Sequence, residues 1–225
     1  KTDEALEIIK RLWSEDSVDF QGKHYHLTGA SISPKPAQPD LPMWIGGSSD
    51  AAILRTARYG TGWQAGPETP EEARGVVAAI KAAAAAAGRI IDEDHYGAGF
   101  PFRFGRADDP GLSKLMEAYQ KRTGRDPAGY FAVGDAAAIT ARIAEYVDAR
   151  VFKFILRPAA KGDEEMTQQT RRLIDEVLPL VKARWPKPLK VKAPRALELL
   201  MLCDASWRKS APIRSWWRLI GLDIV

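Results

Sequence analysis

Short apolar runs alternate with amphipathic segments between residues 43 and 182, and this alternation constrains the fold more than any other feature. The pattern predicts strands at 43–46, 62–65, 95–100 and 151–156, and helices at 50–59, 69–88, 111–122, 135–147 and 163–182. Strands that alternate with helices form a parallel sheet with helical crossovers. A closed eight-fold barrel usually needs about 250 residues. The strand-plus-helix units therefore indicate half of such a barrel or, alternatively, a small open α/β sheet.

The first part of the chain precedes this alternation and has its own pattern. Residues 3–13 are predicted to form a helix capped by Asp3, and residues 18–27 a small hairpin around Gly22. Four prolines then fall within residues 33–42, which predicts an extended connector leading into the strand at 43–46.

The end of the chain differs from the rest in charge and composition. Residues 182–225 hold ten Lys or Arg and three acids, which is a net charge of +7. Because the whole chain has a net charge of +4, residues 1–181 have a net charge of −3. A mildly acidic body does not suggest nucleic-acid binding. Residues 183–225 hold four of the seven tryptophans: Trp185, Trp207, Trp216 and Trp217. A basic, Trp-bearing segment suits a membrane surface or an acidic partner. Because its apolar residues keep no helical period, we favour an irregular or non-native tail outside a domain at 1–182.

Composition sets further bounds on compartment and chemistry. The chain has no apolar run long enough to predict a membrane span, and its first residues show no signal-peptide pattern. It has no starting Met, which is expected of a fragment. The single Cys203 excludes an internal disulfide and fits a reducing, cytoplasmic compartment. The three histidines, His24, His26 and His95, form no Cys/His cluster, so no metal site is predicted.

The candidate site is the stretch from Pro42 to Asp50, with the sequence PMWIGGSSD. An apolar run enters two glycines, Gly46 and Gly47, and then the helix-capping residues Ser48, Ser49 and Asp50. Glycine allows positive φ and close approach of a ligand to the backbone, and free N–H groups at a helix start bind phosphate. Alternatively, the glycines serve only a tight turn, because no complete G-x-G-x-x-G motif or P-loop is present.

The order of several motifs resembles the C-terminal half of the luciferase-like monooxygenase family. The motifs are FQGKHY from Phe20, PKP from Pro34, PMWIGGSS from Pro42, ARYGTGW from Ala57, TPEE from Thr69, FAVGD from Phe131, AEYVDARV from Ala144 and FILRP from Phe154. The resemblance covers roughly residues 1–182. Two positions depart from the family pattern, which often has Asp at Thr61 and Gly at Arg150.

The resemblance implies a (β/α)8 TIM-barrel fold, of which this chain holds only the second half. It implies that a flavin lies at the carboxyl ends of the strands, where Gly46, Gln64, Phe100 and Arg157 are expected. The expected cofactor-binding residues are Gly46, Gly47, Ser48, Ser49 and Arg157. For Arg157, whose guanidinium suits a phosphate or carboxylate, a surface ion pair with Asp163 is the alternative. No catalytic residue is assigned.

The family further implies a flavin-dependent monooxygenase that inserts one oxygen atom of O2 into a small organic substrate. Reduced FMN would come from a flavin reductase or a diffusible pool. One alternative is hydride transfer with the deazaflavin coenzyme F420. Another is a non-catalytic half-barrel that forms a homodimer through its open edges. A third is a small α/β enzyme acting on phosphorylated sugars.

Overall fold

The chain is an α/β protein in a computed structural model that describes residues 1–38, 41–186 and 198–200. In chain order the elements are α1 (Thr2–Ser14), β1 (Val18–Gln21), β2 (His26–Ala30), β3 (Trp44–Gly46), α2 (Asp50–Tyr59), β4 (Gly62–Gln64), α3 (Pro70–Ala86), β5 (Tyr96–Phe104), α4 (Pro110–Thr123), the 3-10 turn η1 (Pro127–Gly129), β6 (Ala132–Gly134), α5 (Ala136–Asp148), β7 (Lys153–Pro158), α6 (Gly162–Arg172), the π-helical turn η2 (Leu173–Val177), α7 (Leu178–Arg184) and β8 (Glu198–Leu200).

The main sheet is parallel, as the alternation predicts. Its strands run in the order β3-β4-β5-β7-β8, and β6 pairs with β5. The long central strand β5 pairs with β4 at its start, with β7 along its middle and with β6 at its end. Over the described part of the chain the sheet stays open and does not close into a barrel.

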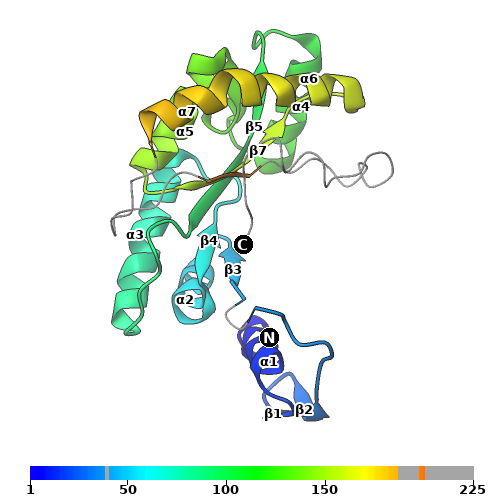
Figure 1. Ribbon diagram of the computed structural model, residues 1–225, viewed down its shortest axis with the longest axis vertical. Coiled ribbons are helices and arrows are strands. Elements are labelled where there is room, and N and C mark those ends of the chain that lie inside the picture. The colour runs from blue at the N-terminus through cyan, green and yellow to red at the C-terminus, as the bar shows by residue number, and fades with distance from the viewer. Residues whose placement is uncertain (39–40, 187–197, 201–225) are drawn as a thin grey trace.

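One face of the sheet holds the core and is covered by helices (Figure 1). Alternate residues of β5 point to this face, and they are Tyr96, Ala98, Phe100, Phe102 and Phe104. They pack with buried residues of α3, α5 and the α6–η2–α7 helix. The Phe100 ring stacks on the ring of Tyr146 in α5 at 5.4 Å. Phe100 is thus a fully buried residue inside β5 rather than at its carboxyl end, because the strand continues to Phe104.

Most of the predicted helices are present, and their ends follow the predicted signals. Thr69 caps α3 in a capping box with Glu72, and Gly124 ends α4 in the left-handed conformation. The last predicted helix is continuous through η2 and reaches Arg184. The prediction that Asp3 caps the first helix is wrong, since α1 begins at Thr2 with no side-chain cap bond.

The helix α1 and the predicted hairpin form a small unit at one end of the molecule (Figure 1). The Glu4 carboxylate of α1 accepts hydrogen bonds from the main-chain N–H groups of Lys23, His24 and Tyr25 in the hairpin turn. Asp3 forms an ion pair of 2.8 Å with Arg55 of α2. These contacts join α1 to the hairpin on one side and to the helix after the candidate turn on the other.

The departure at Arg150 has a visible backbone consequence. Arg150 has a φ of 66°, and among the described residues it alone combines a side chain with positive φ. The family often has glycine at this position, where glycine adopts such a conformation without steric cost. Arg150 therefore holds a strained conformation between α5 and β7.

The structure describes only part of the chain on which the predictions about a membrane span and a C-terminal tail depend. Within the described ranges, no helix is long and apolar enough to cross a membrane. Trp185 packs against the core at the end of α7. The other tail tryptophans and Cys203 lie outside the described residues, as does most of the predicted tail at 183–225.

Candidate cofactor site

The predicted turn lies between β3 and α2, at the carboxyl edge of the sheet. Gly46 ends β3 and pairs with Gln64, the last residue of β4. Gly47 has a φ of +94°, and a Cβ there would come within 3.3 Å of the Ala52 Cβ. The turn from Gly46 to Ser49 is exposed. Glycine is required at position 47 because of its backbone conformation, and the turn is open to a ligand.

Ser49 is the cap of α2. Its hydroxyl accepts a hydrogen bond of 3.3 Å from the main-chain N–H of Ala52. The hydroxyl hydrogen stays available to donate outward, because a serine hydroxyl is both donor and acceptor. Ser49 therefore serves the helix and can still donate a hydrogen bond to an anion.

The Trp63 side chain fixes the turn through a hydrogen bond to its main chain. Trp63 is fully buried in β4, and its indole Nε1–H donates a hydrogen bond of 2.8 Å to the carbonyl of Gly47. In a trans peptide the C=O and the next N–H point in opposite directions. The Gly47 carbonyl points toward Trp63, so the Ser48 N–H points away from it, to the exposed side of the turn.

The turn carries two unused main-chain donors. Within the described ranges, no group accepts a hydrogen bond from the N–H of Ser48 or Asp50, whereas the Gly47 N–H faces the Gln64 carbonyl in the ladder with β4. The positive end of the α2 dipole adds to their partial charge. Such a group of donors at a helix start is suited to a phosphate or another oxyanion.

Next to this turn, the Trp44 ring lies on the sheet face opposite the core. A Cβ on Gly62 would come within 2.7 Å of that ring, and a Cβ on Gly97 within 3.1 Å. The Gln64 side chain also lies over Gly97, at 2.5 Å from where its Cβ would stand. The glycines of β4 and β5 therefore leave room for one tryptophan and one amide, whose packing the sequence did not reveal.

Arg157 lies near the end of β7, where it was predicted, and is exposed. Its guanidinium donates a hydrogen bond of 2.5 Å to the hydroxyl of Tyr130. Tyr130 is buried and stacks on Tyr119 at 5.1 Å, and burial raises the pKa of its phenol. Arg157 is thus held by a neutral hydroxyl and keeps its charge available. No local pattern in the sequence predicted the role of Tyr130, because its partner Arg157 lies on another element.

The structure does not bring Arg157 to the glycine turn. Arg157 pairs with Pro101, four residues beyond Gly97, whereas Gly46 is level with Gln64 and Gly97. The strands β3 and β7 are three strand positions apart, which is roughly 14 Å across a sheet. The two groups therefore face different parts of any shared ligand.

A buried arginine closes the carboxyl end of β5. The Arg103 guanidinium pairs with Glu165 at 2.7 Å and with Asp109 at 3.1 Å, and it donates to the carbonyl of Ala159 at 2.7 Å. Gln169 completes this end by bonding the main-chain N–H and C=O of Phe104. The polar groups of Arg103 and Gln169 thus have partners within the protein, so we assign a structural role to both residues rather than a role in ligand binding.

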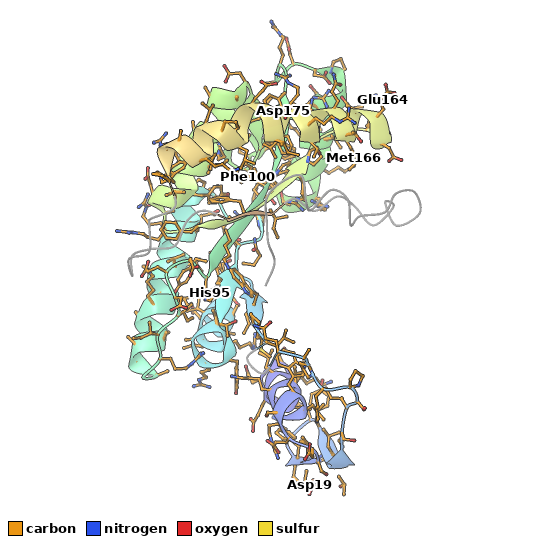
Figure 2. The ribbon with its side chains drawn as sticks, viewed as in Figure 1. Asp19, His95, Phe100, Glu164, Met166 and Asp175 are labelled. Carbon is orange, nitrogen blue, oxygen red and sulfur yellow. The ribbon has the colours of Figure 1, made fainter. Side chains whose placement is uncertain are left out.

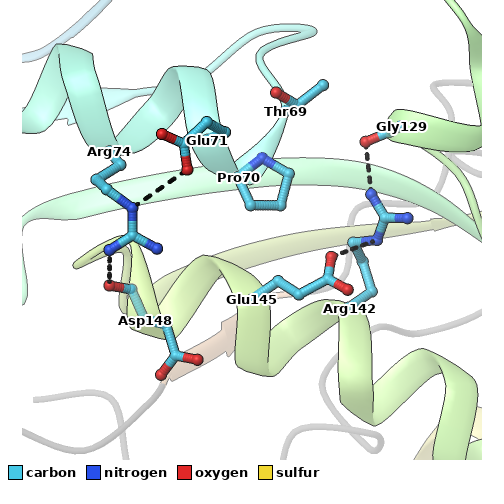
Figure 3. A pocket seen from close by; sticks show the side chains of 8 residues that line it. All are labelled: Thr69, Pro70, Glu71, Arg74, Gly129, Arg142, Glu145 and Asp148. Carbon is cyan, nitrogen blue, oxygen red and sulfur yellow. Dashed lines mark hydrogen bonds and ion pairs between the residues drawn. The ribbon is translucent and has the colours of Figure 1, made fainter.

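A charged hollow of about 350 Å³ lies elsewhere, between α3 and α5 (Figure 3). Its arginines are already paired. Arg74 bonds Glu71 at 3.5 Å and the carbonyl of Asp148 at 2.8 Å, and Arg142 pairs with Glu145 at 3.2 Å. The Arg74–Asp148 bond joins α3 to α5, and the pairing of both arginines leaves the glycine turn as the better anion site.

A parallel sheet with helical crossovers and a glycine turn at a strand's carboxyl end places the chain among the α/β proteins. Within that class, the sequence profile described as luciferase-like monooxygenase matches residues 1–127. The chain belongs to this family, as its motifs indicated.

Curated relatives match a shorter segment. An uncharacterised protein of Mycobacterium tuberculosis (strain H37Rv) and one of Mycobacterium bovis are each 36% identical over 81 residues. The segment is 36% of this chain and 27% of each relative. The match thus spans about a quarter of those relatives' length.

Solved structures share the fold at low identity. A monooxygenase from Streptomyces bottropensis has a TM-score of 0.63 at 20% identity, covering 79% of this chain and 60% of that one. An F420-dependent secondary alcohol dehydrogenase has a TM-score of 0.62 at 18% identity, with 78% and 61% covered. A long-chain alkane monooxygenase has a TM-score of 0.60 at 17% identity, with 81% and 55% covered. The chain therefore has the luciferase-like α/β fold, over part of those structures' length.

Proposed function

We propose that the turn Gly46–Ser49 binds the phosphate of reduced FMN, and that the site belongs to a flavin-dependent monooxygenase acting on a small organic substrate. The observation that carries the proposal is the pair of unused N–H donors of Ser48 and Asp50 at the start of α2. Family membership supports a flavin-type cofactor.

The residues present fit a phosphate. Gly46 and Gly47 let the anion approach the backbone, the Ser48 N–H points outward, and the hydroxyls of Ser48 and Ser49 can donate. The Asp50 carboxylate opposes an anion, but it is exposed to water, which screens its charge. When bound, reduced FMN supplies the electrons for the reaction with oxygen. The chain's part is to bind the phosphate and orient the flavin.

Arg157 belongs to a different part of the proposed site. Arg157 lies away from the glycine turn and is held by the Tyr130 hydroxyl. It would therefore contact the flavin ring system or an anionic group of the substrate rather than the flavin phosphate. The proposal includes the domain at 1–182 as the second half of a barrel, a reductase or diffusible pool as the flavin source, a homodimer and a cytoplasmic location.

The deazaflavin alternative has a specific observation in its favour. Two of the similar structures are F420-dependent enzymes: the alcohol dehydrogenase and a coenzyme F420 dependent tetrahydromethanopterin reductase from Methanopyrus kandleri with a TM-score of 0.61. In that case hydride would pass directly between coenzyme and substrate. The phosphate turn would serve either cofactor, so only binding can separate them.

The test is a comparison of three ligands on the purified full chain, followed by fluorescence or calorimetry. FMN and riboflavin differ only in the phosphate, and F420 supplies the deazaflavin. We expect FMN to bind at least about tenfold more tightly than riboflavin, which corresponds to ~1.4 kcal/mol from the phosphate. Equal affinity for FMN and riboflavin would contradict the phosphate site. Tighter binding of F420 than of FMN would replace the monooxygenase with the hydride-transfer alternative.

A non-catalytic half-barrel gives a distinct result in the same preparation. It predicts a gel-filtration mass of two chains with no saturable binding of any of the three ligands. Saturable FMN binding would exclude a half-barrel that binds no ligand.

A further inference from the structure

A group of three metal-ligand side chains lies at the amino end of β5. Asp92, Asp94 and His95 occupy the turn before the strand, in which the His95 N–H bonds the Asp92 carbonyl at 2.9 Å. Figure 2 shows His95 at the end of the strand away from the helices that cover Phe100. Because the strands are parallel, this is the opposite edge of the sheet from the glycine turn. The group is therefore separate from the proposed flavin site.

The geometry of the group suits a single ion. One ligand atom from each side chain lies within 4.8 Å of the other two. The His95 Nδ1 stands 3.8 Å from the Asp92 Oδ2, and two ligands at ~2.1 Å from a tetrahedral ion are about 3.4 Å apart. A small side-chain movement would bring all three onto one cation.

Asp94 supplies the second, independent observation. It is only 7% exposed, and nothing in the described part of the chain donates a hydrogen bond or an ion pair to its carboxylate. The nearby Lys81 pairs instead with Glu93 at 2.6 Å. The Asp94 oxygens are therefore free to ligate, and a cation held with its neighbours would give them a partner.

We propose that Asp92, Asp94 and His95 bind a divalent cation, with Zn²⁺ as the best match. An imidazole with two carboxylates suits zinc, whereas magnesium prefers oxygen ligands alone. Three protein ligands leave one position of a tetrahedral ion for water. The sequence analysis predicted no metal site because it looked for clustered Cys and His residues, and two of these ligands are aspartates.

The site is placed to stabilise the sheet. The His95 carbonyl accepts a hydrogen bond of 2.9 Å from the Trp63 N–H of β4, and the His95 ring meets the Trp44 ring edge-on at 5.8 Å. A cation that fixes the His95 turn would thereby fix the amino ends of two strands. Its role is structural, and it does not depend on the proposed flavin chemistry.

Thermal unfolding of the chelator-treated full chain, with and without Zn²⁺, tests the proposal. We expect zinc at about 100 times its dissociation constant to raise the Tm by roughly 5 °C or more. The variant Asp94→Asn should lose this increase. Without zinc, the same variant should be about as stable as the parent, because the Asp94 carboxylate has no hydrogen bond or ion pair to lose within the described residues.

The matched control is Glu93→Gln, in the same turn but paired with Lys81 outside the group. It should keep the full zinc-dependent increase. The proposal would be overturned by a parent chain that does not respond to zinc, or by an equal response in Asp94→Asn, which would place the ion elsewhere. Calorimetric titration with Zn²⁺ gives an independent readout, with one equivalent bound by the parent and by Glu93→Gln but not by Asp94→Asn.

Discussion

At the scale of single residues, Trp63 and Gly47 act as a pair across two strands. The sequence predicted both glycines of the turn, because glycine before a helix cap is a local signal. For Trp63 the sequence favoured packing in the core, with a wall of the flavin site as the alternative. The indole hydrogen bond to the Gly47 carbonyl could not be predicted, since the two residues meet only once β3 and β4 are paired.

Replacing Trp63 with Phe should loosen the turn. The change keeps an aromatic ring in the core but removes the 2.8 Å hydrogen bond to Gly47. We expect a loss of about 1–3 kcal/mol in the free energy of unfolding and a several-fold weaker FMN affinity. Urea unfolding and FMN titration measure the two effects. Trp13→Phe in α1 is the control, and it should leave FMN affinity unchanged.

A substitution at Arg150 should increase the stability of the protein, unlike the substitution at Trp63. The positive φ of 66° at Arg150 strains a residue with a side chain, and left-handed geometry costs such a residue ~1 kcal/mol. Arg150→Gly should therefore raise the free energy of unfolding by about 0.5–1 kcal/mol, measured by urea unfolding. The neighbouring Ala149 has an ordinary φ of −81°, so Ala149→Gly should destabilise. Stabilisation by both changes, or by neither, would contradict this explanation.

At the scale of elements, Arg103 joins the end of β5 to the starts of α4 and α6. Asp109 caps α4 and Glu165 lies in the first turns of α6, and both carboxylates pair with Arg103. The main-chain N–H of Leu112, with Arg103, lowers the pKa of Asp109. The main-chain N–H of Lys161, with Arg103, lowers the pKa of Glu165. The network therefore depends on both carboxylates being ionised.

This dependence predicts acid sensitivity. A lowered pKa contributes stability above the ordinary values of 3.8 for Asp and 4.5 for Glu, and this stability is lost as the pH falls through the lowered values. The free energy of unfolding should fall between about pH 5 and about pH 3, and Glu165→Gln should flatten part of that fall. Glu164→Gln, at an exposed neighbouring position, should leave the pH profile as in the parent. Equal slopes in the parent and in Glu165→Gln would contradict the assignment.

The elements differ in how far the sequence could predict them. Helices such as α3 and α4 were predicted nearly to the residue, because their caps Thr69 and Gly124 are local signals. The strand β6 was missed, since three residues between Phe131 and Asp135 carry no measurable alternation. The end of β5 was placed too early at Phe100, because its extension is set by pairing with β6 and β7 rather than by its own residues.

At the scale of the whole molecule, family and fold were predicted from the order of motifs, and the parallel sheet agrees with them. The candidate site was predicted in part. The glycine turn is where it was expected, whereas Arg157 lies three strands away with Tyr130 as an unforeseen partner. The buried Asp94 was also unforeseen. Burial and contacts between elements are properties of the packed chain, and a local pattern does not carry them.

The proposed function requires a flavin phosphate to bind at the turn that contains Gly47. The most direct measurement is FMN titration of the parent beside Gly47→Asp, which puts a carboxylate where the phosphate should bind. The matched control is Gly88→Asp, which adds the same charge at another positive-φ glycine, at +66° with open space around it. We predict saturable binding by the parent and by Gly88→Asp, and loss of binding by folded Gly47→Asp. Equal FMN affinity in all three proteins would contradict a phosphate site at this turn.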